Sequence, residues 1–110
     1  MINEKGNDWN FLIMWEFRPR AGAERQFGEA YGPDGTWARF FALGSGFITT
    51  ELIRDLKNPG RYLTVDLWAS KAAYEKFGEK YAAEYQEIDA KCEALTEQER
   101  ELGVFERLKS

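Results

Sequence analysis

The sequence predicts a single α+β domain whose strands and helices follow the order βαββαβ. Two observations lead to this prediction: four runs have strand-like composition, and the segments between them have apolar residues at helical spacing. Because a chain of 110 residues is too short to bury two cores, we expect one domain over residues 1–110. Residues 1–9 are mostly polar and are expected to form an N-terminal extension.

The first half of the domain is expected to contain a strand, two helices and a second strand. Residues 10–18 (NFLIMWEFR) form the first strand, which is apolar on both faces over most of its length. Helical spacing follows, until the turn formers at residues 32–35 (GPDG) end it. A short helix with Asp34 or Thr36 as its N-cap comes next, and residues 47–54 (FITTELIR) form the second strand.

The third strand is expected at residues 61–68 (RYLTVDLW), joined to the second strand by the loop at residues 55–60 (DLKNPG). Side chains alternate between the two faces of a strand, so one face here is aliphatic. The other face mixes aromatic and polar residues, namely Tyr62, Thr64, Asp66 and Trp68. This asymmetry predicts that one face packs on helices and the other meets a less uniformly apolar surface.

A long amphipathic helix and a last strand complete the predicted domain. Ser70 is a good N-cap, and apolar residues follow it at gaps of three and four. Gly78 costs about 1 kcal/mol relative to alanine inside a helix, so a kink or a break is expected near it. Thr96 and Glu99 have the form of a capping box for one more short turn, which places the last strand at residues 102–109.

This order predicts a ferredoxin-like fold, in which a four-stranded antiparallel sheet carries its helices on one face. The other face stays open, and we expect it to be a large aromatic patch because the third strand carries Tyr62 and Trp68. Soluble monomers rarely expose such a patch. Face-to-face pairing of two sheets would bury it, so the sequence predicts a homodimer with a cavity between the sheets.

Charge and hydropathy exclude several kinds of partner. The net charge is −4 and the basic residues are scattered, so the chain lacks the basic surface that binds a phosphate backbone, and no nucleic-acid partner is expected. The first ten residues lack the charged and apolar regions of a signal peptide. No apolar run approaches the roughly 20 residues that span a bilayer. We therefore expect no membrane partner and a cytoplasmic location.

The residues available for chemistry are limited, because the chain has no histidine and one cysteine, Cys92. Histidine is the commonest metal ligand and the commonest general base. We expect no bound metal ion, and Cys92 is interpreted as a buried thiol that packs like a small apolar side chain. Any reaction must use carboxylates, Tyr, Arg, Asn, Trp, the thiol or the ligand itself.

Three segments resemble the antibiotic-biosynthesis-monooxygenase family of dimeric α/β barrels. They are YGPDGTWARFF at residues 31–41, GFITTELIRD at residues 46–55 and RYLTVDLWASKAAYEKF at residues 61–77. The resemblance extends from Trp15 to Phe77, which is over half of the chain. It implies the fold more specifically than the reaction, because the family includes cofactor-independent quinone-forming monooxygenases, haem-degrading enzymes and members with no assigned activity.

The resemblance disfavours haem cleavage here. In the haem-degrading branch it implies an Asn, a Trp and a His, and the corresponding positions in this chain are about Trp15, Phe77 and Glu87. The cofactor-independent branch instead implies a polycyclic phenol bound between sheet and helices, which reacts with oxygen through its own carbanion. Such a protein must shape the pocket, take one proton and hold an oxyanion, so no cofactor is expected.

Asp66 and Arg39 are the candidate catalytic residues. Asp66 lies mid-strand among apolar neighbours, where desolvation would raise the pKa of its carboxyl and suit it to act as a general base. A structural ion pair or a cap with a neighbour such as Arg54 or Arg61 is the alternative. Arg39 is the one cation in an aromatic segment and could hold an oxyanion, or it could be a solvated surface side chain. Glu16 and Glu51 are similar candidates on other strands, with the same structural alternative.

Aromatic residues on four of the expected elements are the candidates for binding a flat ligand. The predicted substrate-binding residues are Trp15, Trp37, Phe41, Tyr62, Trp68, Phe77 and Tyr81. Aromatic side chains also dominate cores and interfaces, so a purely structural role is the alternative for each of them.

Three hypotheses about function follow from these residues. The first is a cofactor-independent monooxygenase-like homodimer that acts on a hydrophobic aromatic or quinone-like small molecule. The second is a non-catalytic dimeric protein that binds a small hydrophobic ligand in the same cavity. The third is a structural protein in which the dimer interface fills the cavity. The first hypothesis rests largely on fold analogy, which does not by itself determine a reaction, so the arrangement of the site has to distinguish the three.

Overall fold

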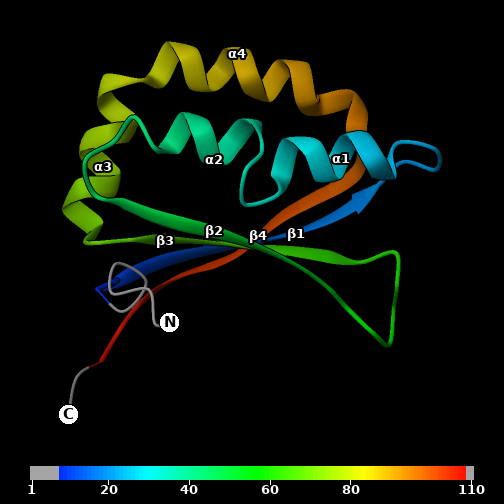
Figure 1. Ribbon diagram of the computed structural model, residues 1–110, viewed down its shortest axis with the longest axis horizontal. Helices are drawn as coiled ribbons and strands as arrows, with labels where there is room; N and C mark the ends of the chain where they lie inside the picture. Colours follow the sequence, from blue (N-terminus) through cyan, green and yellow to red (C-terminus); the bar gives the residue numbers. More distant parts are fainter. Residues whose placement is uncertain (1–7, 109–110) are drawn as a thin grey trace.

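The computed structural model describes residues 8–108. Residues 1–7 of the predicted N-terminal extension and Lys109 of the predicted last strand lie outside this range. The described chain forms an α+β domain in which a four-stranded antiparallel sheet carries helices on one side, as Figure 1 shows. The predicted ferredoxin-like fold is therefore confirmed.

The sheet has the strand order β2-β3-β1-β4, with every neighbouring pair antiparallel. Its strands are β1 (Phe11–Pro19), β2 (Phe47–Arg54), β3 (Tyr62–Trp68) and β4 (Thr96–Glu106). The two central strands are β1 and β3, and β2 and β3 form the predicted hairpin. In Figure 1 the end of this hairpin bends away from the layer of helices.

The helical layer consists of α1 (Glu24–Tyr31), α2 (Thr36–Phe41), α3 (Lys71–Lys80) and α4 (Ala82–Cys92), followed by the short 3-10 helix η2 (Glu93–Leu95). The α-helices all lie on the same side of the sheet (Figure 1). Two of them come between β1 and β2, and the other two come between β3 and β4.

The starts and breaks of the helices follow from local chemistry. The Ser70 hydroxyl accepts a hydrogen bond of 3.0 Å from the backbone N–H of Ala73, which confirms the predicted N-cap of α3. The expected interruption of the long helix falls at Tyr81, three residues after Gly78, where the backbone leaves the helical region (φ −115°, ψ 26°). The N-cap of α2 is Gly35, so the prediction of Asp34 or Thr36 was wrong.

Gly35 occupies this position because a side chain does not fit there. A Cβ atom at Gly35 would lie 2.5 Å from the carbonyl oxygen of Glu29 and 2.8 Å from that of Ala30. Both atoms belong to the backbone of α1, which cannot yield without moving the helix. The close approach of α1 and α2 therefore depends on a glycine at their junction.

The prediction of a capped turn at Thr96 was also wrong. The chain is already extended at Thr96 (φ −125°, ψ 147°), and β4 pairs with β1 from Thr96 onward. Pairing with a central strand gives the backbone more hydrogen bonds than one capped turn would. The 3-10 turn therefore comes earlier, at residues 93–95, and β4 begins six residues before the strand predicted at residues 102–109.

The two faces of the sheet are the reverse of the prediction. The pairs Phe11↔Trp68, Ile13↔Asp66 and Trp15↔Thr64 place the aromatic and polar residues of β3 on one face with the apolar odd-numbered residues of β1. This face packs under the helices, and Trp68 is completely buried there. The open face is instead mainly aliphatic along β1 and β3, with Leu12, Met14, Leu63, Val65 and Leu67.

Trp68 is the centre of the core between the sheet and the helices. Its ring centroid lies 5.3 Å from those of Phe47 and Phe77 and 5.8 Å from that of Phe41. Tilted and edge-to-face pairs of this kind are worth about 0.5–1.5 kcal/mol each beyond the area that they bury. The packing therefore ties β2, α2 and α3 to one side chain on β3.

Replacing Gly35 by alanine tests the contact between α1 and α2. We expect Gly35→Ala to lower the free energy of unfolding by about 1–3 kcal/mol, because its Cβ would overlap backbone atoms that are 2.5–2.9 Å away. Gly28→Ala is the matched control, since nothing lies within 4 Å of a Cβ there and alanine favours a helix by about 0.5–1 kcal/mol. Urea denaturation measures both; equal effects of the two substitutions would contradict the packing described here.

Candidate functional site

A cavity of about 290 Å³ lies between the sheet and the helices, and it is the candidate functional site. Its lining comes from all four strands and three of the helices. The residues are Trp15, Phe17, Tyr31, Trp37, Phe41, Thr50, Thr64, Asp66, Tyr85, Asp89 and Glu99.

The sheet forms the floor of this cavity, and the strand register sets the order of its residues. Along β1, Ile13 is opposite Asp66, Trp15 is opposite Thr64, and Phe17 is opposite Glu99. Moving along the floor, one therefore meets the Asp66 carboxyl first, then the Trp15 indole, then the Glu99 carboxyl. Four residues of β1 separate the two ends, which is about 13 Å at the usual rise of a strand.

The helices form the roof, with the Trp37 indole of α2 at its centre. The Trp37 centroid is 5.0 Å from the Tyr85 ring on α4 and 5.7 Å from the Phe41 ring one turn further along α2. Tyr31 on α1 reaches from the roof to the floor, where its ring lies 4.6 Å from that of Phe17. A flat ligand would therefore meet aromatic surfaces above and below.

Asp66 is the one buried carboxylate of the described chain, with 7% of its surface exposed. Its Oδ1 accepts a hydrogen bond of 2.6 Å from the Thr50 hydroxyl on the neighbouring strand β2. Within residues 8–108 the carboxylate has no other hydrogen-bond partner and no ion pair. Desolvation raises the pKa of Asp66 from 3.8 to about 6, although the bond from Thr50 opposes this rise.

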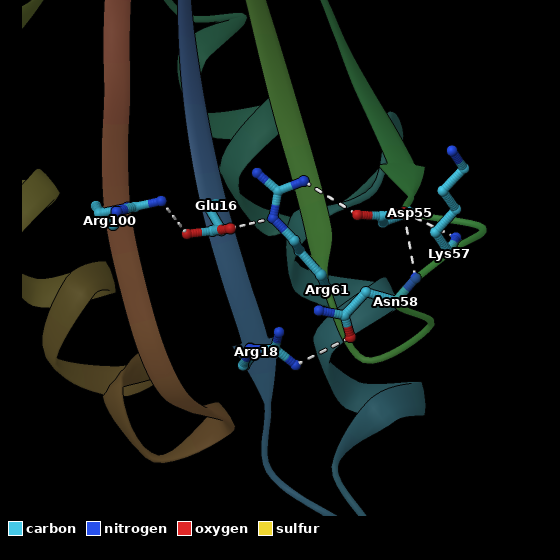
Figure 2. Close-up of polar contacts among 7 residues, drawn as sticks. All are labelled: Glu16, Arg18, Asp55, Lys57, Asn58, Arg61 and Arg100. Carbon is cyan, nitrogen blue, oxygen red and sulfur yellow. Dashed lines mark hydrogen bonds and ion pairs between the residues drawn. The ribbon is translucent and has the colours of Figure 1, made fainter.

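The arginine that could have neutralised Asp66 is engaged elsewhere. Arg61 pairs with Glu16, and its Nη1 lies 3.2 Å from Oδ2 of Asp55, as Figure 2 shows. Arg100 contacts the same Glu16 carboxylate at 2.8 Å, and the hydrogen bond from Arg61 is the main cause of the lowered pKa of Glu16. These charges lie on the open face, since Glu16 is opposite Leu63. The alternative interpretation of Asp66 as an ion-pair residue therefore does not hold.

Two exposed carboxylates, Asp89 of α4 and Glu99 of β4, lie at the other end of the cavity. Partial burial and the nearby charge of Asp89 raise the pKa of Glu99. Burial also raises the pKa of Tyr85 to about 12 and raises that of Tyr31, so both phenols are neutral near pH 7. At neutral pH this end of the cavity is negatively charged.

The structure brings four of the sequence-predicted site residues together and separates the other five from them. Trp15, Trp37, Phe41 and Asp66 line the cavity. Tyr62, Trp68, Phe77 and Tyr81 do not line it. Trp68 and Phe77 are core residues, Tyr62 packs against Phe27, and Tyr81 packs against Phe40 and Phe77.

Arg39 lies outside the cavity. Its Nη1 donates a hydrogen bond of 2.9 Å to the backbone carbonyl of Asp34, and its side chain is exposed. It borders a separate surface depression together with Pro33 and Ile48. The helical period explains the difference: Trp37 and Phe41, four residues apart, face the cavity, whereas Arg39 lies between them on the opposite side of α2.

Sequence reasoning missed seven of the lining residues, which are Phe17, Tyr31, Thr50, Thr64, Tyr85, Asp89 and Glu99. A signal existed for some of them. Tyr85 and Asp89 are four residues apart, which places them on one helix face, and Thr64 shares a strand face with Asp66. Thr50 could not be assigned without the register of β2, and Glu99 was interpreted as half of a capping box.

Other kinds of site find no support in the described chain. Within residues 8–108, no three His, Cys, Asp or Glu side chains gather closely enough to hold a metal ion. Cys92 is a free, buried thiol, and burial raises its pKa. None of the helices over this range has the length and apolarity that crossing a bilayer requires.

Fold and cavity together define a ferredoxin-like domain with an acidic, aromatic-walled site between sheet and helices. The family model for antibiotic biosynthesis monooxygenase matches residues 10–87. The chain therefore belongs to the antibiotic biosynthesis monooxygenase family, as its sequence resemblance indicated. No curated protein matches the sequence.

Several solved structures share the fold at low sequence identity. SnoaB, a cofactor-independent oxygenase from Streptomyces nogalater, is 18% identical over 93% of this chain and 96% of its own, with a TM-score of 0.65. A protein from Deinococcus radiodurans, provisionally assigned as an antibiotic biosynthesis monooxygenase, is 13% identical over 91% and 94%, with a TM-score of 0.70. PA3566 from Pseudomonas aeruginosa is 16% identical over 92% and 96%, with a TM-score of 0.64.

Substituting asparagine for Asp66 tests the burial of its charge. The pKa of Asp66 is raised in the folded state, so the folded protein binds a proton on this carboxyl more tightly than the unfolded chain does. This proton contributes fully to stability below about pH 4, and the contribution is lost as the pH rises through about 6. A rise of about two pKa units corresponds to roughly 3 kcal/mol. At pH values above 7, we therefore expect Asp66→Asn to raise the midpoint temperature of thermal unfolding. At pH 4 the substitution should leave this temperature nearly unchanged.

Glu97→Gln is the control for this experiment, because Glu97 is exposed and does not line the cavity. It should change the thermal midpoint little at either pH. If Asp66→Asn lowered stability equally at pH 4 and pH 8, the carboxylate would be stabilising in its ionised form and the proposed desolvation would be incorrect.

Proposed function

We propose that this protein is a cofactor-independent monooxygenase that oxidises a small hydrophobic phenol or quinone-like compound in the cavity. The observation that supports this most directly is Asp66, an unpaired carboxylate beside aromatic walls with a pKa of about 6. The Asp66 carboxyl is mostly ionised at pH 7, and its pKa is close enough to 7 for it to accept a proton. Membership of the monooxygenase family supports the same reaction type.

The proposed reaction needs only the phenol and oxygen. Asp66 accepts the proton of the phenol hydroxyl, which leaves a phenolate whose ring carbon is electron-rich. That carbon forms a bond to O₂ and gives a ring hydroperoxide after the proton is returned. Loss of water from the hydroperoxide yields the quinone, so one phenol and one O₂ give one quinone and one H₂O.

Hydroxyl groups are the donors that the cavity offers to the phenolate. Thr64 and Tyr85 line it, and neither side-chain hydroxyl has a hydrogen-bond partner within residues 8–108. Neutral donors that are already in place stabilise a developing oxyanion without reorganisation. Arg39, the cation predicted from the sequence for this role, is not part of the proposal because it lies on the other side of α2.

A non-catalytic binding protein is the second candidate function, and one observation favours it. The lining includes no lysine or arginine, so the cavity has no positive charge with which to hold an oxyanion. A protein that only binds a neutral aromatic compound needs no such charge. Both candidates predict saturable binding, so only turnover distinguishes them.

We also propose that the protein works as a homodimer joined through the open face of the sheet. The aliphatic side chains of β1 and β3 continue there to exposed Phe105 on β4 and Ile53 on β2. Contiguous apolar surface of this kind is typical of interfaces, and a two-fold axis would pair the face with its own copy. The ion pairs around Glu16 and Arg61 would border this interface.

Asp66→Asn should abolish turnover while Arg39→Gln should not. Losing a general base costs about 10²–10⁴-fold in rate, whereas Arg39 lies outside the cavity. Oxygen consumption with a panel of one- and two-ring phenols measures both variants. Equal activity of Asp66→Asn and wild type would remove Asp66 from the mechanism, and binding without oxygen consumption by wild type would favour the second candidate.

Val65→Arg tests the proposed dimer. Val65 lies at the middle of the open face, so a buried arginine there should convert the dimer to a monomer. Analytical ultracentrifugation measures the mass, with Gln86→Arg on the exposed side of α4 as the control. A monomeric wild-type protein would contradict the proposal, as would a Val65→Arg variant that remained dimeric.

A further inference from the structure

The charge of the cavity is negative at both ends, and no cation in the described chain balances it. Asp66 lies at one end of the floor, and Asp89 and Glu99 lie at the other. None of the three carboxylates forms an ion pair within residues 8–108. The charged groups that act on Glu99 are themselves carboxylates, Asp89 and Glu93.

Two arginines close to Glu99 in the sheet do not reach the cavity. Arg100 is opposite Glu16 in the register of β1 and β4 and pairs with it on the open face, and Arg18 donates to Asn58. Both arginines border a second depression, which Glu99 also borders, but neither of them lines the cavity. The strand register places their side chains on the face of the sheet opposite to the cavity floor.

Asp66 provides an independent indication of a ligand. More than nine-tenths of this residue is buried, it lines the cavity, and only one of its oxygens has a partner, the Thr50 hydroxyl. The second oxygen has no partner within residues 8–108 and is therefore available to a hydrogen-bond donor on the ligand. The indole N–H of Trp37, on the roof of the cavity, is a buried donor that has no acceptor within the described chain. A buried polar atom without a partner costs free energy, so such atoms are rare unless they bind something.

The spacing of the carboxylates indicates what kind of ligand fits. The three side chains do not gather around one point, so a metal ion does not satisfy them together. A cavity of about 290 Å³ is near the lower limit of pockets that take drug-sized ligands, about 300 Å³. It suits one ring or two small rings with polar groups at opposite ends, rather than the polycyclic compound that the family resemblance implied.

We infer that the ligand of this cavity is a small phenol that carries a protonated amine. Its ring lies between Trp15 on the floor and Trp37 on the roof, and its hydroxyl donates a hydrogen bond to Asp66. The ammonium group lies between Asp89 and Glu99, beside the ring of Tyr85. This inference rests on the proposed function in so far as both concern the same cavity, and it specifies the substrate class.

The amine is the part of the ligand that the negative charge selects. An ammonium group would relieve the repulsion between Asp89 and Glu99, and the neighbouring aromatic face of Tyr85 attracts cations. A carboxylate on the ligand would meet charge of the same sign at either end. The cavity therefore discriminates among phenols of the same size by the charge at the end distant from the hydroxyl.

Three probes with one ring and different charges test this inference: tyramine, 4-ethylphenol and 4-hydroxyphenylacetate. Isothermal titration calorimetry at pH 7.5 should show tyramine binding to the wild-type protein about tenfold more tightly than 4-ethylphenol, which is the ratio expected of one charge-assisted contact. We expect 4-hydroxyphenylacetate to bind most weakly. Added salt should reduce the affinity for tyramine and leave that for 4-ethylphenol unchanged.

The double variant Asp89→Asn/Glu99→Gln should remove the preference for tyramine and preserve the affinity for 4-ethylphenol. Glu97→Gln is the matched control, because Glu97 is an exposed acid on β4 that does not line the cavity. Retained binding of 4-ethylphenol shows that the double variant is folded. The inference is overturned if tyramine fails to bind, binds no better than 4-ethylphenol, or keeps its advantage in the double variant.

Oxygen consumption with the same probes separates this inference from the proposed function. If tyramine binds most tightly and no probe is oxidised, the charge preference stands and the monooxygenase proposal fails. If 4-ethylphenol is oxidised and tyramine is neither preferred nor oxidised faster, the monooxygenase proposal stands and the inference fails.

Discussion

The register between β1 and β3 is the constraint on which the rest of the structure depends. It sets Phe11, Ile13, Trp15 and Phe17 opposite Trp68, Asp66, Thr64 and Tyr62, and all eight side chains face the helices. A shift of either strand by one residue would turn its four side chains to the open face. The same pairing therefore determines the aromatic core, the floor of the cavity and the aliphatic surface on the other side.

Burial of the Asp66 carboxylate lowers the stability of the folded protein at neutral pH. Asp66 is buried beside aromatic rings with one hydroxyl as its partner, while Arg61, the nearest plausible counter-ion in sequence, pairs with Glu16 and Asp55 across the sheet. An ion pair would have lowered the pKa of Asp66 and made it a weaker base. The separation of this carboxylate from the arginines thus destabilises the fold, but it maintains the raised pKa that proton transfer requires.

The order of elements could be predicted from the sequence, whereas several details could not. The bounds of β2 were predicted correctly as residues 47–54, because a run rich in β-branched and apolar residues between Gly46 and a turn sequence leaves little choice. The start of β4 was missed, since Thr96 and Glu99 satisfy a local capping pattern that pairing with β1 overrides. At the site, Asp66, Trp15, Trp37 and Phe41 were identified from the sequence, but Thr50, Asp89 and Glu99 were not.

The sequence by itself determined the fold class, the helix and strand order and the unusual position of Asp66, because these depend on periodicity and on local chemistry. Only the tertiary structure decided which face of the sheet the helices cover. Both faces of β1 and β3 carry apolar residues, so hydrophobic pattern alone could not choose between them. It also decided that Arg39 lies away from the cavity and that Asp89 and Glu99 border it, since residues on separate elements come together only through strand register and helix packing.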